Sequence, residues 1–310
     1  MNISRSLSTP ALPAGSTCVA LGLFNGLHLG HMAVIEKMMV MSGEYELTPL
    51  VFTFTAANNI PAAKGKMTFL LSPDMTNTML VQAGVREMVC PDFDEFRSLE
   101  PGQFIRDVLS VRLGAARVVC GYDFHFGKNA AGDTQSLRKL CEQRGIAVDV
   151  VPAVFADGQP AATRRIRAFI EEGNIPAANR LFGRPFAIDF EVIHGRQLGR
   201  TLDWPTINQA FPAGFTLPRF GVYATISNVG GKLYSSVTNV GVKPTVGSNA
   251  VLAETYIQGF AGDLYGERIE VQFLKFLRPE QKFPSLDALK EAIGADAKRA
   301  HKVASALLKG

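Results

Sequence analysis

The stretch that decides the fold of the first half of the chain is Leu21-Gly22-Leu23-Phe24-Asn25-Gly26-Leu27-His28-Leu29-Gly30-His31. An apolar run over residues 18–23 predicts a buried strand, and the glycines that follow predict a turn. Apolar residues then recur at helical spacing and predict a helix that begins near His31: Val34, Ile35, Met38 and Met39. A strand, a glycine turn and a helix N-terminus together favour phosphate, because backbone N–H groups and the helix dipole attract anions.

The residues of this turn suit the same chemistry. Gly22 and Gly30 allow the backbone to approach a ligand closely. The imidazoles of His28 and His31 orient a phosphate when they are neutral and neutralise its charge when they are protonated. Two histidines three residues apart are also common as solvated or locally hydrogen-bonded side chains. The residue types alone therefore leave both interpretations open.

The string Phe-Asn-Gly-Leu-His-Leu-Gly-His resembles the HxGH signature of nucleotidyltransferases in its F-D-G-x-H-x-G-H form. That form is similar to the adenylyltransferase half of the bacterial bifunctional riboflavin kinase/FMN adenylyltransferase family, also called FAD synthetase. The resemblance implies that His28 and His31 are catalytic and contact the phosphates of ATP. It implies a nucleotide-binding role for Gly22, Phe24, Asn25 and Gly30. Asn25 departs from the family, which usually has Asp at this position.

Length and composition limit the architecture. A chain of 310 residues is long for one core and predicts two domains. The net charge of +4, from 32 basic and 28 acidic residues, is too balanced to predict a nucleic-acid surface. The four cysteines lack CxxC or metal-type spacing, and Cys18, Cys90 and Cys120 each open or close an apolar run, which predicts buried thiols. Without a signal pattern or an apolar run of about 20 residues, we expect a cytoplasmic protein that does not enter a membrane.

Strand-like and helical runs alternate in the first half, which predicts a parallel sheet with ligands beyond the carboxyl ends of its strands. A predicted strand over residues 117–120 opens into Gly121-Tyr122-Asp123-Phe124-His125-Phe126-Gly127-Lys128. This string resembles the G-x-D/N-F-x-F-G block of the same family, and the resemblance implies that Asp123 helps to hold the nucleotide. The alternative is that Phe124 and Phe126 are core residues and Asp123 caps a turn.

Two further family motifs are eroded. Thr55-Ala56-Ala57-Asn58 follows a predicted strand over residues 47–54 and lacks the Pro-His-Pro-like element of the family. Ala161-Ala162-Thr163-Arg164-Arg165-Ile166-Arg167 resembles a Ser-Ser-Thr-x-x-Arg-like motif with fewer hydroxyls. The resemblance implies that Arg167 contacts the departing pyrophosphate. A solvated basic turn explains these arginines equally well.

The pattern changes after a linker at Gly183-Arg184-Pro185, so we predict domains over residues 1–183 and 184–310. Short alternating runs between Gly, Pro and Asn turns predict an antiparallel β-barrel with strands at residues 186–192, 221–226, 233–240 and 268–276. Helical spacing predicts C-terminal helices that cover the barrel through Leu286, Leu289, Ile293, Ala300, Val303 and Leu307. The expected fold class is α/β plus β, with a Rossmann-like nucleotidyltransferase domain before the barrel.

The second half contains Gly199-Arg200-Thr201-Leu202-Asp203-Trp204-Pro205-Thr206-Ile207-Asn208, which resembles the riboflavin kinase block G-R-x-L-G-F-P-T-A-N. Thr206 and Asn208 alternate onto one side of an extended segment and offer neutral oxygens, which suit Mg²⁺ beside nucleotide phosphates. The resemblance implies that Gly199, Thr206 and Asn208 bind nucleotide, the last two also holding Mg²⁺. Pro-Thr-x-Asn alone predicts only a turn. Asp203 and Trp204 replace the family's glycine and phenylalanine.

Another block, Asn239-Val240-Gly241-Val242-Lys243-Pro244-Thr245-Val246-Gly247, resembles the family's N-x-G-x-R-P-T string. Ala253-Glu254-Thr255-Tyr256-Ile257 follows, and the resemblance places Glu254 at the position of the general base. A ribityl hydroxyl must lose a proton while it attacks the γ-phosphate of ATP, and a carboxylate accepts that proton. An isolated glutamate in a strand is otherwise a solvent-facing residue.

The resemblance extends from Cys18 to Lys302 and implies a bifunctional enzyme. The C-terminal domain is expected to phosphorylate riboflavin with ATP and Mg²⁺, giving FMN. The N-terminal domain is expected to adenylylate FMN with a second ATP, giving FAD and pyrophosphate. The expected partners are these small molecules alone, for a monomer or a weak homo-oligomer. Three alternatives remain: a riboflavin kinase with a degenerate adenylyltransferase domain, a non-catalytic flavin-binding regulator, and a nucleotidyltransferase for another phosphate acceptor.

Overall fold

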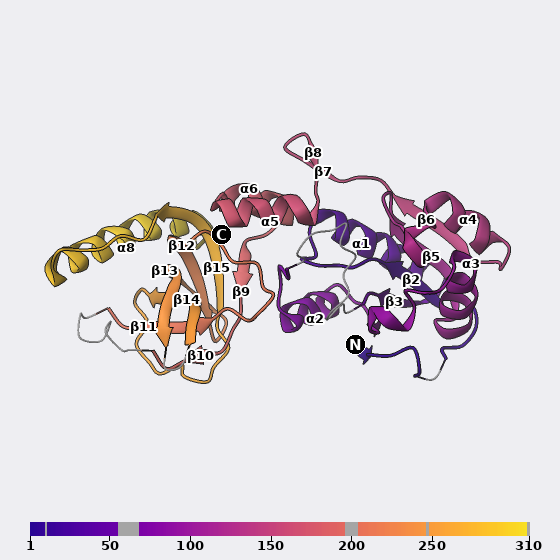
Figure 1. Cartoon of the computed structure of the whole chain (residues 1–310), viewed down its shortest axis with the longest axis horizontal. Helices are drawn as coiled ribbons and strands as arrows, with labels where there is room; N and C mark the ends of the chain where they lie inside the picture. Colours follow the sequence, from indigo (N-terminus) through magenta and orange to yellow (C-terminus); the bar gives the residue numbers. More distant parts are fainter. Residues whose placement is uncertain (10, 55–67, 196–203, 246–247, 309–310) are drawn as a thin grey trace. The chain divides into compact units, whose positions relative to one another are not determined.

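The computed structural model describes residues 1–9, 11–54, 68–195, 204–245 and 248–308. Its chain forms two compact units (Figure 1). The first unit contains residues 1–67 and 73–162, and the second contains residues 68–72 and 163–310. Within the described ranges, no helix is both long enough and apolar enough to cross a bilayer.

The first unit is built on a six-stranded parallel sheet in the order β1-β4-β3-β2-β5-β6. Its strands are β1 (Asn2–Ser4), β2 (Thr17–Leu21), β3 (Thr48–Phe52), β4 (Glu87–Val89), β5 (Ala115–Gly121) and β6 (Ala147–Val151). From β2 the chain builds the sheet outward through β3 and β4 on one side, and later through β5 and β6 on the other. The order therefore reverses between β2 and β5, the point where ligands bind in such sheets.

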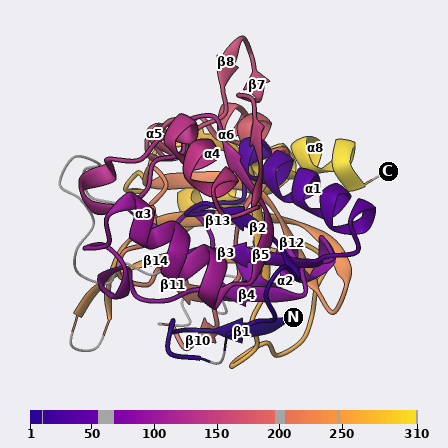
Figure 2. The ribbon, with the colours of Figure 1, turned by 90° about the vertical axis from the view of Figure 1, so that its right-hand side faces the viewer.

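Helices cover both faces of this sheet (Figure 1). They are α1 (Leu29–Glu44), α2 (Pro73–Gln82), α3 (Pro101–Gln103), the π-helical η3 (Phe104–Arg112) and α4 (Thr134–Glu142), with short 3₁₀ turns η2 (Phe93–Glu95) and η4 (Lys128–Ala130). Val19 and Leu21 of β2 pack in one buried cluster with Leu109 of η3 and Leu137 of α4. Figure 2 shows β1 beside β4 at the sheet edge, and the hairpin of β7 (Phe155–Ala156) and β8 (Gln159–Pro160) projecting from this unit.

The second unit contains a seven-stranded antiparallel sheet in the order β10-β11-β14-β13-β12-β15-β9, curved into a half-barrel. Its elements are α5 (Thr163–Glu172), α6 (Ile175–Phe182), β9 (Phe186–Ile188), β10 (Val192–Ile193), β11 (Thr206–Ala210), β12 (Gly221–Val229), β13 (Lys232–Thr245), β14 (Ser248–Ile257), β15 (Glu270–Arg278) and α8 (Leu286–Leu308). Two irregularities in the β12–β15 pairing add curvature.

The prediction of one strand over residues 186–192 was wrong. β9 and β10 lie at opposite edges of the sheet, although β10 begins only four residues after β9 ends. Between them, the carboxylate of Asp189 accepts a hydrogen bond from Arg268 at 3.1 Å, and Phe190 is buried against Phe211 and Phe215. Four residues span at most roughly 14 Å, so the two edges of the sheet must come close together. This short connection curves the sheet, so that the expected barrel is present as a half-barrel with two edges that are unpaired among the described residues.

The predicted C-terminal helices form one continuous helix, α8. Frequent alanines favour helix across this region, and Gly294 is tolerated at its centre because it lies against the indole of Trp204. The buried face consists of Asp296, Ala297, Ala300 and Ala304. Leu286 and Leu307 are exposed, so their predicted packing on the barrel was wrong.

The compact units divide the chain at residue 163, because α5 and α6 group with the half-barrel. Their contacts include the side chain of Asn179, which donates a hydrogen bond to the carbonyl of Phe273 in β15. The sequence pattern instead places the domain boundary after residue 183, at the linker. The two criteria differ because the linker lies between α6 and the sheet on which α6 packs.

Asp296 provides a stability test of the α8 interface. It is 1% exposed and accepts from Arg278 at 2.8 Å and from Arg299 at 2.8 Å. We expect Asp296→Ala to lower the free energy of unfolding by about 3 kcal/mol, because it leaves the largely buried Arg278 without its counter-charge. The measurement is urea denaturation followed by the emission of Trp204, which packs against the same helix.

Arg299→Ala is the control for this prediction, because the Arg299 side chain is 54% exposed. It should cost less than about 1 kcal/mol. An Asp296→Ala protein as stable as the Arg299→Ala protein would show that the buried carboxylate does not anchor α8.

Candidate functional site

The first site lies at the carboxyl ends of β2 and β5. These strands pair in parallel with Leu21 beside Cys120. The turn over residues 22–28 therefore begins next to the segment that carries Asp123. The structure thus brings together the two motifs that the sequence predicted at strand ends, at the reversal in strand order.

The turn has an unusual backbone. Phe24 and Leu27 adopt φ values of 51° and 41°, in the left-handed region that side chains other than glycine rarely occupy, and Gly26 has φ 94°. Leu27 is fully buried, and the hydroxyl of Thr53 donates to the carbonyl of Leu23 at 2.8 Å. Surrounding contacts therefore hold the turn in a strained form, which is typical of ligand-binding loops.

His28 is the N-cap of α1. Its Nδ1 accepts a hydrogen bond from the backbone N–H of Gly30 at 3.1 Å, so the neutral ring carries its proton on Nε2. The ring is 5% exposed and stacks on that of His31, with centroids 3.7 Å apart. A side chain at position 30 would lie 3.2 Å from the His28 ring, which explains the glycine.

Phe24 completes this group of rings. Its ring meets that of His31 edge-on at 5.5 Å between centroids and lies over Gly22, where an added Cβ would be 3.0 Å from it. The predicted residues Gly22, Phe24, His28, Gly30 and His31 therefore form one contiguous set, and Asn25 belongs to the same turn. Their roles toward a nucleotide remain predictions.

Asp123 is exposed beyond the end of β5, and its backbone carbonyl hydrogen-bonds with the His125 ring at 2.9 Å. Phe124 and Phe126 pack on the core cluster, as the alternative interpretation proposed, while the Asp123 carboxylate is exposed to solvent. The packing of Phe124 and Phe126 is therefore confirmed, and the role of Asp123 toward a nucleotide stays a prediction.

Sequence analysis missed an aromatic group near the same strand ends. Phe54, just beyond β3, stacks on Phe93 with centroids 4.9 Å apart and meets Phe96 edge-on at 5.6 Å. Phe54 and Phe93 are only partly buried. These rings come from separate segments, so only their position after a predicted strand was visible in the sequence.

Arg167 lies in α5, within the second unit. Its guanidinium donates to the hydroxyl of Thr68 at 2.9 Å and to the Thr68 carbonyl at 3.0 Å. Burial lowers the pKa of Arg167, and the charge of Glu171 opposes that shift. Thr55-Ala56-Ala57-Asn58, the eroded Pro-His-Pro position, lies outside the described residues.

The second site is a polar row across the half-barrel. Asn208 on β11 and Asn239 on β13 both pair directly with Glu254 on β14, so the three side chains share one face of the sheet. Thr206 is on the same face, opposite Tyr256. Trp204, the single tryptophan, meets the Tyr256 ring edge-on at 4.7 Å and so packs beside these residues.

Asn208 is 6% exposed, and its amide lies over Gly195, where any side chain would overlap it. The predicted ligand Gly199 is outside the described residues. Thr206 and Asn208 offer neutral oxygens beside the Glu254 carboxylate, a donor set that suits Mg²⁺ with nucleotide phosphates. No group of three or more His, Cys, Asp or Glu side chains that could hold a metal occurs among the described residues.

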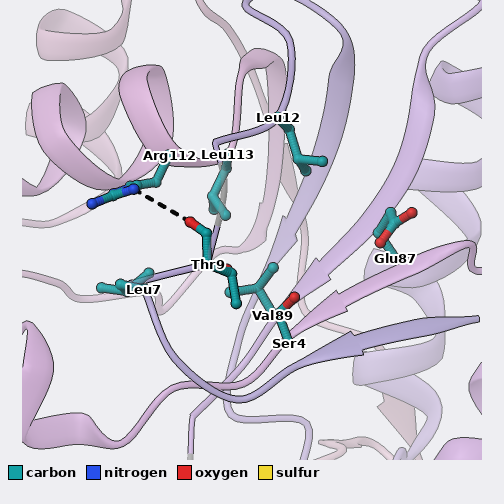
Figure 3. Close-up of a pocket in the computed structure, with 8 residues that line it drawn as sticks. All are labelled: Ser4, Leu7, Thr9, Leu12, Glu87, Val89, Arg112 and Leu113. Atoms are coloured by element: carbon teal, nitrogen blue, oxygen red, sulfur yellow. Dashed lines mark hydrogen bonds between the residues drawn. The ribbon is translucent and has the colours of Figure 1, made fainter.

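Two cavities among the described residues of the first unit are lined by residues outside these motifs. A cavity of about 30 Å³ is lined by Ser4, Leu7, Thr9, Leu12, Glu87, Val89, Arg112 and Leu113 (Figure 3). It has room for one or two water molecules and is too small for a nucleotide. An open hollow of about 430 Å³ is lined by residues of α3, η3 and α4 with their flanking positions, none of them in a motif. The predicted site residues of this unit line neither cavity.

The four cysteines are free thiols, as expected. Cys18, Cys120 and Cys141 are fully buried, and burial raises their pKa values to about 11, about 12 and about 12. Cys90 is partly exposed, so the prediction of a buried thiol was wrong there, although partial burial still raises its pKa. Thiols that remain protonated are poor nucleophiles and poor metal ligands, so none of the four suits a catalytic role.

Together, the parallel sheet with its HxGH turn and the half-barrel with its polar row define a two-domain phosphate-transfer enzyme. Two family models agree with this class. The model for FAD synthetase matches residues 13–165 of the chain, and the model for riboflavin kinase matches residues 182–304. A curated relative from Pseudomonas fluorescens, named bifunctional riboflavin kinase/FMN adenylyltransferase, is 33% identical over 94% of this chain and 95% of its own. The relative of the same name from Escherichia coli K12 is 31% identical over 96% of both.

The chain belongs to the bifunctional riboflavin kinase/FMN adenylyltransferase family. Among solved structures, a Streptococcus pneumoniae protein described as a macrolide-efflux protein has a TM-score of 0.83 and 26% identity to this chain. That similarity covers 96% of this chain and 98% of the other, so the fold extends through both units.

Two substitutions of His28 separate its role in helix stability from its proposed role in the chemistry. His28→Ala removes the N-cap acceptor of α1 and should lower the free energy of unfolding by about 1 kcal/mol. His28→Asn supplies another good N-cap acceptor and should keep most of that stability. Thermal or urea unfolding of both variants tests this, and equal losses would show that the His28–Gly30 hydrogen bond does not stabilise the helix.

The cysteines provide a second test. At pH 8, thiols with pKa values of about 11 to 12 are protonated, so Cys18, Cys120 and Cys141 should not react with a disulfide reagent in the folded protein. Only Cys90 should react, and slowly. All four should react in denaturant, where burial no longer raises the pKa. Rapid labelling of a buried cysteine in the native protein would contradict this assignment.

Proposed function

We propose that this chain makes FAD in two steps, phosphorylating riboflavin in the second unit and adenylylating FMN in the first. The observation that carries the proposal is the polar row of Asn208, Glu254 and Asn239, which the strand register aligns on one face with Thr206. Membership of the family supports both activities.

In the kinase step, Glu254 accepts the proton of the terminal ribityl hydroxyl while the oxygen attacks the γ-phosphorus of ATP. The bond from that phosphorus to the bridging oxygen breaks, and ADP leaves. Thr206 and Asn208 would hold Mg²⁺, which when bound neutralises charge on the phosphates. Trp204 and Tyr256 border the same face and shield it from water.

In the adenylyl step, the FMN phosphate attacks the α-phosphorus of ATP and pyrophosphate leaves. A phosphate is already a nucleophile, so this site works by positioning and by neutralising charge. The Nδ1 atom of His28 accepts from Gly30, so the proton of the neutral ring is on Nε2, and this N–H would donate to a phosphate. His31 stacks on that ring and orients it, Phe24 lies against His31, and Asp123 contacts the nucleotide from the neighbouring strand end.

The aromatic group beyond β3 suits the flavin of this second step. Phe54 and Phe93 present partly exposed ring faces, and such faces stack on a planar heterocycle. Their segments follow β3, which pairs with β2, and β4, which pairs with the far side of β3. Flavin and adenine would then occupy opposite sides of the HxGH turn.

Riboflavin kinase activity alone is the second candidate. Asn25 stands in place of the family's Asp, and the Arg167 guanidinium is hydrogen-bonded to Thr68. Both features would weaken phosphate contacts in the adenylyl step and leave the kinase row intact.

We further propose that the protein is cytoplasmic and is a monomer or a weak homo-oligomer, with the boundary between its domains near residue 184. Its partners would be riboflavin, FMN and ATP, with no role for nucleic acid or membrane.

The deciding experiment incubates purified protein with riboflavin, excess ATP and Mg²⁺ and separates the flavins by chromatography. FAD is the expected product. Accumulation of FMN alone would favour the kinase-only candidate. Unchanged riboflavin under both oxidising and reducing conditions would contradict the kinase assignment.

Two variants should divide the activities. Glu254→Gln should lower FMN formation from riboflavin by about a hundredfold to ten-thousandfold, because it removes the general base. It should leave FAD formation from supplied FMN unchanged. His28→Asn should do the opposite, lowering FAD formation about a hundredfold or more by removing a phosphate contact. Loss of both activities in either variant would contradict the assignment of one site to each unit.

A further inference from the structure

The polar row ends in a second carboxylate. Beyond Asn239, the side chain of Glu280 accepts a hydrogen bond from the Asn239 Nδ2 atom at 3.2 Å. Glu280 follows β15 by two residues, and Arg278 at the end of that strand is anchored to the buried Asp296. The order across the sheet is therefore Asn208, Glu254, Asn239 and then Glu280.

Glu280 determines how the Asn239 amide is oriented. An ionised carboxylate accepts hydrogen bonds and donates none, so the amide nitrogen must face Glu280. The amide oxygen, Oδ1, then points the other way. This oxygen is buried and accepts no hydrogen bond from any described residue. A buried acceptor without a donor is uncommon and costly, and it indicates that a ligand supplies the donor.

Gly241 makes room for this arrangement. It lies on the same face of β13 as Asn239, and a Cβ at this position would overlap the Glu280 carboxylate. Gly241 does not have a positive φ, so its backbone conformation is open to any residue. The space for the carboxylate, rather than the backbone, is what requires glycine here.

We propose that Asn239 Oδ1 binds a hydroxyl of a polyol side chain, next to the hydroxyl from which Glu254 takes a proton, and that Glu280 is the positioning residue for this contact. The inference rests on the proposed kinase function. Asn239 and Glu254 are directly opposite, so their Cβ atoms are about 5 Å apart, a spacing that suits hydroxyls on adjacent carbons. The side chains of Asn239 and Glu254 are both partly exposed.

This contact selects a class of substrate. An acceptor oxygen between two carboxylates favours a neutral hydroxyl donor and disfavours a phosphate. The row therefore binds an unphosphorylated polyol with hydroxyls on its last two carbons. It also binds the phosphorylated product less well.

The test compares two substrates in two proteins. One is riboflavin, and the other is a flavin that keeps the terminal hydroxyl but has hydrogen in place of the neighbouring one. In the unaltered protein, the missing hydroxyl should lower kcat/KM about tenfold. Asn239→Ala should lower kcat/KM for riboflavin by about the same factor and should not lower it further for the deoxy flavin. If Asn239→Ala lowered kcat/KM for the deoxy flavin by the same factor as for riboflavin, the two effects would be independent and the proposed contact would be overturned.

Gly241→Ala and two Glu280 variants test the positioning role. The alanine methyl should displace the carboxylate and reduce the discrimination between the two flavins, while the fold persists as judged by Trp204 emission. Glu280→Ala should have the same effect. Glu280→Gln keeps an acceptor oxygen and should retain most of the discrimination. Full discrimination in Glu280→Ala would overturn the positioning role.

The failures of the two hypotheses are distinguishable. An unaltered protein that does not phosphorylate riboflavin contradicts the kinase function itself. An unaltered protein that phosphorylates both flavins equally well keeps that function and overturns only the role of Asn239. FAD formation from supplied FMN, measured in every variant, confirms that the rest of each protein is folded.

Discussion

Backbone register between neighbouring strands is the constraint on which both sites depend. In the first unit, the pairing of β2 with β5 sets Leu21 beside Cys120, and each motif begins just beyond these residues. A shift of that pairing would separate the HxGH turn from Asp123 by several ångströms. The core on both sides of β2 prevents such a shift, because its residues from 18 to 20 are fully buried. The hydrophobic interior thus fixes the position of polar groups that it does not contain.

The second unit uses the same device in antiparallel form. β14 pairs on both sides, so Glu254 has Asn208 on one neighbour and Asn239 on the other. In an antiparallel sheet a slip of one residue would turn a side chain to the opposite face. The opposite face contains buried hydroxyls. Among them, the Thr238 hydroxyl forms hydrogen bonds with the hydroxyls of Thr225 and Thr255, each at 2.9 Å. These bonds connect β12, β13 and β14 and oppose such a slip, which keeps the general base on its face.

Local patterns in the sequence were sufficient for the class of each unit and for the motif residues that follow one another along the chain. They were insufficient where distant segments decide the outcome. The run over residues 186–192 has the alternation of one strand. Asp189 is bound by Arg268, just before β15, and Phe190 packs on Phe211, just beyond β11, so these two residues divide the run. The Phe54–Phe93 stack, the Arg167–Thr68 hydrogen bonds and the Glu280–Asn239 pair likewise join segments that no spacing rule relates.

The glycines of the motifs show how sequence and site are connected. Gly22 lies under the Phe24 ring, Gly30 under the His28 ring, Gly195 under the Asn208 amide and Gly241 under the Glu280 carboxylate. In each case a Cβ would meet the side chain of a residue that we place in a site. None of these four glycines has a positive φ. The space that each glycine leaves for a neighbouring side chain, rather than freedom of the backbone, explains why glycine occurs at these positions. At these four positions the glycine leaves the volume that the site side chain occupies, and at Gly241 that side chain is the Glu280 carboxylate.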